Sequence, residues 1–298
     1  MLRPGPLEAL SYPPAAAAGI RLFVKRDDRY AYAPDSPLQG NKVRKLAPWL
    51  KNPSSLRGRT VVSFGGAYSN HLAALAAAGR RFDFATRMYV RGEAITNPTL
   101  EFLEDCGSEL RFVDRAAYRI KHTTNWQRSV GLTEAEVVIP EGGSSVAGLA
   151  PVGEVFAETV HQLGAAPDYF CLSAGTGSTA AGVILAAGGS ATRIEVYPAL
   201  KGDWMRKVIT DWIGGGTPAE WEIVPGCSFG GYARFPPHWE FSLPPGAIAT
   251  RVNIGIDGLP PLEPVYTAKL FSGVLDRVSS GSYPVGSTVV LLHTGGIY

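Results

Sequence analysis

The chain has 298 residues, of which 45% are hydrophobic and 18% are charged, so it can bury a substantial core in one large domain or two ordinary ones. Its formal net charge of +2 is too small to indicate a nucleic-acid-binding or membrane-binding surface. No apolar run approaches the length of a membrane span, and the N-terminus lacks the apolar core of a signal peptide. We therefore expect neither a nucleic-acid nor a membrane partner.

The three cysteines, Cys106, Cys171 and Cys227, are odd in number and widely spaced. This pattern argues against a disulfide framework and favours a reducing compartment, so we expect a cytoplasmic protein. The histidines show no metal-ligand spacing, and we predict no metal site.

Strand patterns alternate with helix patterns along most of the chain, after a proline-rich and alanine-rich start that we expect to cover a surface. Strands are predicted at residues 22–28, 60–64, 87–90, 110–113, 137–140, 169–173, 193–197, 221–224 and 287–292. Helices are predicted from residue 42, with Pro48 interrupting that helix early, and at residues 73–79, 99–106, 151–163, 180–187 and 266–278. Such alternation is typical of parallel β-α-β units. The proline-rich segment between residues 230 and 264 is predicted to be an irregular loop.

Residues 39–46, Gln-Gly-Asn-Lys-Val-Arg-Lys-Leu, place Lys42 between a glycine turn and a run typical of a helix start. A lysine amine forms a Schiff base with a carbonyl, which is how pyridoxal phosphate enzymes attach their cofactor. By itself, however, the segment is more typical of a solvated helix lysine. The remainder of the sequence has to decide between these interpretations.

The loop Gly175–Thr179 lies between a predicted strand and a predicted helix. Glycines let the backbone approach an anion, and the helix N-terminus offers free amide hydrogens, to which the loop adds three hydroxyls. The pattern is neither a P-loop nor a dinucleotide fingerprint, so a phosphate monoester fits best. The alternative is a tight turn that binds nothing.

Ser69, Asn70 and His71 stand at another predicted helix start. We interpret them as a second anion site, for a substrate carboxylate, with Ser69 placed for proton transfer. The alternatives are that Ser69 or Asn70 only caps the helix, and that His71 is a hydrogen-bonded core residue. Tyr266 could likewise be an ordinary aromatic residue at a helix start.

Five motifs occur in order along the chain, namely Gly40–Leu46, Gly65–His71, Gly175–Thr179, Pro264–Lys269 and His293–Gly296. Together they resemble the 1-aminocyclopropane-1-carboxylate (ACC) deaminases and D-cysteine desulfhydrases, a family of enzymes that use pyridoxal 5′-phosphate (PLP). Each motif alone is weak, but five in order are specific. The resemblance extends over nearly the whole chain.

The resemblance implies an α/β fold of the tryptophan-synthase-β type (fold type II), with two open twisted α/β domains and the cofactor in the cleft between them. Because no linker separates the two halves, we expect interleaved domains. The larger, PLP-binding domain would comprise residues 1–46 and 148–298, and the smaller one residues 47–147. The resemblance also implies a homodimer.

The resemblance further implies a role for each motif. Lys42 would bind PLP covalently, Asn70 would contact the ring oxygen of the cofactor, and Thr294 would face its pyridine nitrogen. The phosphate would be held by Gly175, Thr176, Gly177, Ser178 and Thr179. The expected catalytic residues are Lys42, Ser69 and Tyr266. The small amino-acid substrate would contact Ser69, Asn70, His71, Tyr266 and Thr267.

The chain departs from the family pattern at Tyr68, Ser178 and Ala268, where glutamine, glycine and glycine are usual. The stretch from Phe235 to Leu259 is also longer than the resemblance leads us to expect. These changes bear on the choice of substrate rather than on the use of PLP.

We therefore predict a PLP-dependent lyase, and D-cysteine is the first substrate candidate, giving pyruvate, ammonia and hydrogen sulfide. Thr267 and Thr294 stand where ACC deaminases carry glutamate and leucine. A carboxylate near the ring would favour the electron-withdrawing pyridinium that ring opening needs. One alternative is ACC deamination to 2-oxobutyrate and ammonia, and another is a non-catalytic protein that binds PLP or a metabolite.

Overall fold

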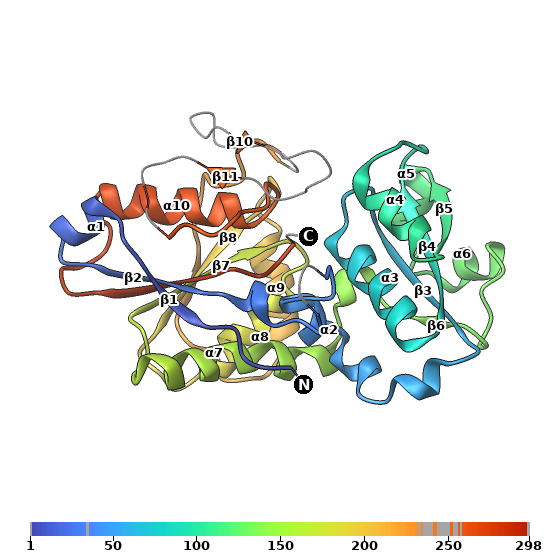
Figure 1. The fold of residues 1–298 in the computed structure, drawn as a ribbon, viewed down its shortest axis with the longest axis horizontal. Helices are drawn as coiled ribbons and strands as arrows, with labels where there is room; N and C mark the ends of the chain where they lie inside the picture. Colours follow the sequence, from blue (N-terminus) through green and yellow to red (C-terminus); the bar gives the residue numbers. More distant parts are fainter. Residues whose placement is uncertain are drawn as a thin grey trace.

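The computed structural model describes residues 2–33, 36–231 and 258–296, together with residues 234, 241–242, 251–252 and 256. Two α/β lobes lie next to each other, each built on its own sheet (Figure 1). Most of the predicted long stretch from residue 235 to residue 259 falls outside the described residues. No helix in the described part of the chain is long and apolar enough to cross a membrane.

The larger sheet contains six strands in the order β1-β2-β12-β7-β8-β9. Their bounds are β1 Leu7–Leu10, β2 Arg21–Lys25, β12 Thr288–Leu292, β7 Tyr169–Ala174, β8 Arg193–Pro198 and β9 Trp221–Ile223. Only β1 pairs antiparallel with its neighbour, and the other pairs are parallel. The start of the chain, which we expected only to cover a surface, thus supplies the edge strand β1 and the helix α1 (Pro13–Ala17).

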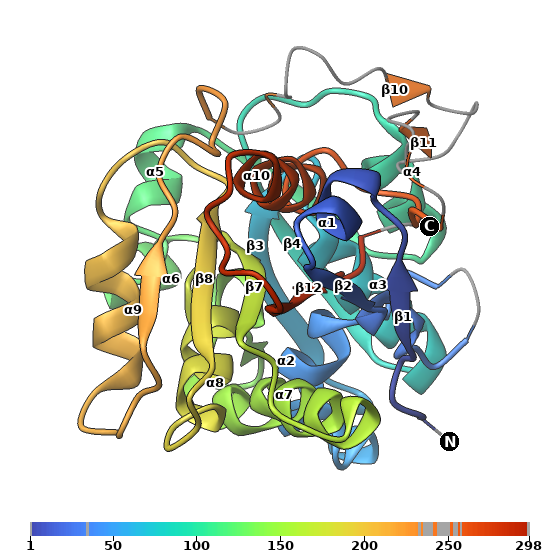
Figure 2. The same ribbon diagram turned by 90° about the vertical axis from the view of Figure 1, so that its left-hand side faces the viewer.

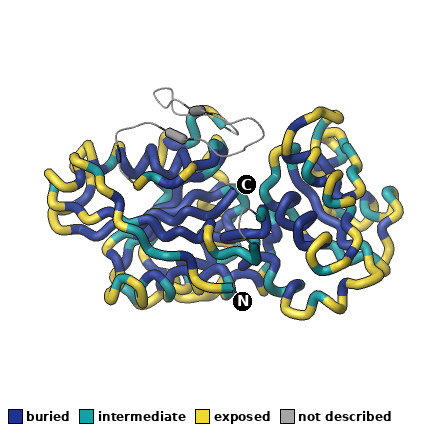
Figure 3. The backbone as a smooth tube through the Cα atoms, viewed as in Figure 1, coloured by how far each residue is buried: buried dark blue, intermediate teal, exposed yellow. Residues whose placement is uncertain are grey.

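Helices cover both faces of this sheet, as the turned view in Figure 2 shows. The helices on one face are α7 (Leu149–Leu163), α8 (Ser178–Ala186) and α9 (Met205–Ile213), and those on the other are α1 and α10 (Thr267–Ser279). Successive residues of β7 point to opposite faces, so Phe170 and Leu172 pack with α7 and α8 while Cys171 packs with α10. A sheet covered in this way is buried on both sides (Figure 3).

The smaller sheet has four parallel strands in the order β5-β4-β3-β6. Their bounds are β3 Thr60–Gly66, β4 Ala85–Arg91, β5 Glu109–Val113 and β6 Val137–Val138. The helices α3 (Asn70–Phe82) and α4 (Pro98–Asp105) cover one face, and α5 (Arg115–Arg119) and α6 (Thr124–Ser129) cover the other. The strand-helix alternation predicted from the sequence is therefore present, although α5, α6 and α9 were not predicted. Short elements complete the description: the 3-10 turns Asp27–Arg29, Pro53–Leu56, Glu141–Gly143 and Val146–Gly148, and the paired strands β10 (Phe241–Ser242) and β11 (Arg251–Val252).

Helix α2 (Asn41–Leu50) lies where the two lobes meet and packs against both α7 and α3. The prediction that Pro48 interrupts this helix early was wrong. Proline lacks only its own amide hydrogen, and it stands in the last turn, so the helix continues to Leu50 and Lys51 N–H still donates to the Ala47 carbonyl.

Candidate active site

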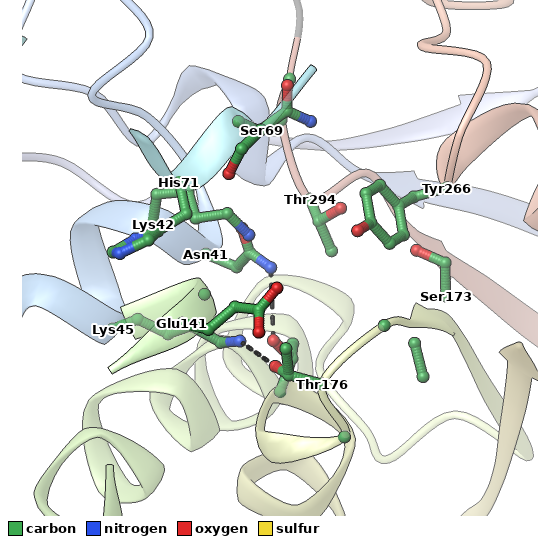
Figure 4. Close-up of a pocket in the computed structure, with 18 of the residues that line it drawn as sticks. Asn41, Lys42, Lys45, Ser69, His71, Glu141, Ser173, Thr176, Tyr266 and Thr294 are labelled. Atoms are coloured by element: carbon green, nitrogen blue, oxygen red, sulfur yellow. Dashed lines mark hydrogen bonds between the residues drawn. The ribbon is translucent and has the colours of Figure 1, made fainter. Parts of the chain in front are cut away.

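A cavity of about 170 Å³ opens between the lobes, at the carboxyl ends of β3, β7 and β12. This is the edge at which open parallel sheets bind their ligands. Of the predicted site residues, ten line the cavity: Lys42, Ser69, Asn70, His71, Gly175, Thr176, Gly177, Thr179, Tyr266 and Thr294. Figure 4 shows side chains from both lobes facing the same space. Ser178 and Thr267 are not part of its wall.

Lys42 stands in the first turn of α2, and its Nζ donates a hydrogen bond to Asn41 Oδ1 at 3.0 Å. Burial lowers the pKa of Lys42 to about 8, although the charge of Glu263 opposes the shift. A lysine with this pKa supplies more of the neutral amine that reacts with carbonyls. Gly40 precedes the helix with φ of 56°, and a side chain there would collide with the Thr294 carbonyl.

The loop between β7 and α8 forms the floor of the cavity. Gly177 has φ of 76°, in the left-handed region, and α8 begins at the next residue. A Cβ atom on Gly175 would lie 2.8 Å from Tyr266 Cε1, so glycine lets the loop and the tyrosine ring come together. Asn41 Nδ2 donates to Thr179 Oγ1 at 3.2 Å and ties the loop to α2.

Lys45 is a cavity residue that we did not assign from the sequence. It is buried, its Nζ donates to Thr176 Oγ1 at 3.2 Å, and among the described residues no carboxylate forms an ion pair with it. Burial, and then the charge of Lys42, lowers its pKa well below the ordinary lysine value. Lys45 lies three residues after Lys42, so both side chains lie on one face of the helix. This spacing within residues 39–46 could have indicated Lys45 from the sequence.

Ser69 caps α3, because its Oγ accepts the Leu72 N–H at 3.3 Å. The capping alternative is therefore correct, yet Ser69 also lines the cavity. His71 bonds through Nε2 to Ser63 Oγ at 2.8 Å, and Ser63 in turn donates to the Ile139 carbonyl. Nε2 thus carries the proton, and the buried Nδ1 has no hydrogen-bond partner among the described atoms. Burial, followed by the two lysine charges, lowers the pKa of His71 well below its ordinary value.

Thr267 and Ser178 do not line the cavity, and their hydroxyl groups form hydrogen bonds to residues next to it. Thr267 Oγ1 accepts the Glu263 N–H at 2.8 Å and donates to the Glu263 carbonyl at 3.1 Å, so its hydroxyl is engaged at the start of α10. The Glu263 carboxylate accepts three backbone N–H groups there, and burial raises its pKa to about 7. Ser178 donates to Ser144 Oγ at 2.9 Å, and this hydrogen bond links the Gly175–Thr179 loop to Ser144.

Thr294 is the second residue after β12, and its carbonyl accepts the Asn41 N–H at 3.3 Å. In the close-up, its side chain lies beside Tyr266 and Ser173, across the cavity from Thr176 and Lys45 (Figure 4). Ser173, at the end of β7, was not singled out from the sequence because nothing local distinguishes it from a core serine.

The family model for pyridoxal-phosphate dependent enzymes matches residues 2–201. The chain belongs to this family. It is 29% identical to the ACC deaminase of Variovorax paradoxus, over 99% of this chain and 92% of that protein. It is 28% identical to the ACC deaminase of Methylobacterium nodulans, over 98% and 92% respectively.

Solved structures agree on the fold. An ACC deaminase homologue superposes with a TM-score of 0.74 at 22% identity, covering 99% of this chain and 90% of that one. Maize serine racemase superposes with a TM-score of 0.66 at 15% identity, covering 100% and 89%. The predicted fold type II and the predicted use of PLP are thereby confirmed.

The cavity fits this cofactor. The phosphate monoester of PLP is an anion, and Lys45 is a buried amine that has no carboxylate partner in the described part of the chain, so an anion beside it would favour its charged form. The α8 N-terminus and the Thr176 hydroxyl lie beside it. Lys45, Thr176 and the loop from Gly175 to Thr179 would therefore hold the phosphate, and Lys42 would be the amine to which the cofactor attaches.

We predict that Gly177→Val weakens PLP binding by about tenfold or more. A β-branched residue is strained at φ of 76°, and its Cβ would lie 2.9 Å from Val208 Cγ1, so the loop and α8 must shift. The measurement is absorbance titration of the apo-protein with PLP. Gly189→Val is the matched control, since Gly189 has φ of 81° with open space around it. Unchanged affinity in the Gly177 variant would place the phosphate elsewhere.

Proposed function

We propose that the protein is a PLP-dependent lyase that removes a β-substituent from a small amino acid and releases a 2-oxo acid and ammonia. D-cysteine is the first candidate substrate. The observation that supports this choice is the hydroxyl of Thr294 opposite the Lys45 and Thr176 side of the cavity (Figure 4). Among the described lining residues the only carboxylate is Glu141, which lies on the Lys45 side.

When bound, PLP supplies a carbonyl that an amine can attack and a ring that delocalises the negative charge left at the substrate's α-carbon. The protein's residues position both partners. The start of α3, with Ser69 and Asn70, presents amide hydrogens to the substrate carboxylate. Thr294 would offer a neutral hydroxyl to the ring nitrogen, and a ring so contacted would be less firmly protonated than one facing a carboxylate.

The groups in the cavity that can transfer protons are the Lys42 amine and the Ser69 hydroxyl. Lys42 has a pKa of about 8, so it can accept the α-proton near neutral pH and return it later. Ser69 Oγ accepts the Leu72 N–H, which leaves its own proton available to the substrate. Tyr266 closes the opposite wall with its ring against Gly175.

ACC deamination to 2-oxobutyrate and ammonia is the second candidate, and the names of the relatives favour it over the D-cysteine reaction. It needs a stronger electron sink than the expulsion of hydrosulfide. Thr267 carries no negative charge, and its hydroxyl is engaged with Glu263 rather than with the cavity.

The deciding experiment is to incubate the holoenzyme separately with D-cysteine and ACC and to assay pyruvate, 2-oxobutyrate and sulfide. We expect sulfide and pyruvate from D-cysteine and little 2-oxobutyrate from ACC. Abundant 2-oxobutyrate without sulfide would reverse the order of the two candidates. If the protein binds PLP but gives no product from either compound, both candidate reactions are refuted and the non-catalytic alternative gains support.

We further propose a division into residues 1–46 with 148–298 and residues 47–147, a homodimer, and a cytoplasmic location. The division is supported by the small sheet, whose four strands all fall between residues 60 and 138. Light scattering of the purified holoenzyme tests the dimer, and a monomer at micromolar concentration would refute it.

A further inference from the structure

Arg91 is a cation at the mouth of the cavity that the proposed reaction does not use. It is the last residue of β4 and pairs in register with Gly66, the last residue of β3. Its guanidinium therefore emerges beside the turn that leads into Ser69, and a Cβ atom on Gly66 would lie 3.7 Å from Arg91 Nη2. Both Arg91 and Ser69 line the catalytic cavity.

A second hollow, of about 500 Å³, adjoins the catalytic cavity and shares Arg91 and Glu141 with it. Its wall carries four cations and one carboxylate: Arg91, Arg115, Arg119 and Lys121, with Glu141. We call it the basic annex. Its remaining lining residue is Tyr118.

The charges of the basic annex do not cancel. Lys121 Nζ pairs with Glu141 Oε2 at 3.0 Å, which uses the one carboxylate of the wall. The three arginines form no ion pair with any carboxylate among the described residues. A guanidinium stays charged at physiological pH, so the annex presents a net positive field next to the reacting centre.

The ring of Tyr118 lies beside two of these cations, Arg91 and Lys121, without neutralising them. Its ring is buried, and it lies 5.6 Å from the Arg91 guanidinium carbon and 4.2 Å from Lys121 Nζ. A cation–π contact attracts a guanidinium without engaging its N–H donors as an ion pair would.

We propose that the basic annex, with Arg91 as its inner residue, binds a negatively charged group on the β-substituent of the substrate. The inference rests on the proposed lyase function and extends its substrates beyond D-cysteine to amino acids whose β-substituent carries a carboxylate or another anion. The α-carboxylate already has the α3 N-terminus with Ser69 and Asn70, and a hollow of about 500 Å³ is far larger than one carboxylate needs. A substituent reaching from the α-carbon toward Arg91 would occupy it.

The test compares S-carboxymethylcysteine with S-carbamoylmethylcysteine, in both enantiomers, as substrates of the holoenzyme. Each loses its α-proton and a thiolate as the C–S bond breaks, and water hydrolyses the enamine product to pyruvate and ammonia. The pair differs only in a terminal carboxylate or amide. We expect kcat/KM to favour the acid by about tenfold or more, as a charge-assisted bond to arginine implies.

Arg91→Gln should bring this ratio close to one, and Arg91→Lys should leave part of it because the charge remains without the planar fork. Arg111→Gln is the matched control, since it removes an exposed cation of the same sheet that pairs with Glu109 outside the annex. A ratio near one in the wild type, or equal losses for both substrates in Arg91→Gln, would overturn the proposal. Equal losses would mean that Arg91 binds the α-carboxylate.

A binding measurement separates this proposal from the lyase function. Aspartate and asparagine are a second acid–amide pair, and their binding changes the absorbance of bound PLP without requiring turnover. If aspartate binds at least about tenfold more tightly than asparagine, and only when Arg91 is present, the annex is supported even when neither the thioethers nor D-cysteine react, which is the result that would refute the lyase function. Equal affinities for the two would refute the annex whatever the fate of the thioethers.

Discussion

Replacing Lys42 with alanine should abolish both turnover and the borohydride-trappable attachment of PLP, while the fold stays intact. The Lys42 amine can form a bond with the cofactor carbonyl and also accept the α-proton, whereas the second amine of the cavity, Lys45, contacts Thr176 in the loop proposed to hold the phosphate. Loss of the proton transfer alone should lower kcat by about 10²–10⁴-fold. Alanine is a good helix former, so α2 should still begin at Asn41.

Mass spectrometry after borohydride reduction measures the attachment, and a pyruvate assay measures turnover. Lys207→Ala is the control, because Lys207 is an exposed lysine of α9 that pairs with Asp211. Lys42→Arg should not restore activity, since a guanidinium remains charged and is a poor nucleophile. Full activity in Lys42→Ala would refute the proposed role of Lys42 in cofactor attachment and proton transfer.

Arg44→Met should lower the free energy of unfolding by about 3–5 kcal/mol, as expected when one partner of a buried ion pair is removed. Arg44 is almost fully buried, and its Nη2 lies 2.8 Å from both Asp27 Oδ1 and Glu158 Oε2. The guanidinium also stacks 4.0 Å from the centre of the Tyr30 ring. Methionine would leave the Asp27 carboxylate buried without this cation. The measurement is urea unfolding followed by circular dichroism.

Two further variants give this prediction its controls. Adding Asp27→Asn to Arg44→Met should recover part of the loss, because the uncompensated charge is then gone. Arg111→Met removes an exposed pair with Glu109 and should change stability by less than about 1 kcal/mol. A loss below about 1 kcal/mol for Arg44→Met would show that the buried network contributes little.

The sequence predicted those strands, helices and loops whose own residues carry a recognisable pattern. The glycines and hydroxyls of the Gly175–Thr179 loop stand between an apolar strand and a helix, and the loop lies in the cavity as that pattern indicates. The edge strand β1 was missed because a four-residue strand between prolines has no periodicity of its own. It exists through its pairing with β2.

Side chains that depend on distant partners could not be assigned from the sequence. Lys45 matters because folding brings it to Thr176, and Arg91 because β4 ends level with β3. Thr267 shows the converse error. Its place next to Tyr266 suggested a substrate contact, but the start of α10 turns its hydroxyl toward Glu263.

The strand order of the large sheet also determines when the cavity can first exist during synthesis. β12 lies between β2 and β7, and the cavity residues Thr294 and Gly295 come two and three residues after it. The partner strand β12 is synthesised some 260 residues after β2. At 5–20 residues per second, this delay is roughly 13–50 seconds. The four-stranded lobe has all its strands long before then. The cofactor site is thus assembled after the four-stranded lobe, and until β12 is made a nascent chain has an unpaired edge on β2.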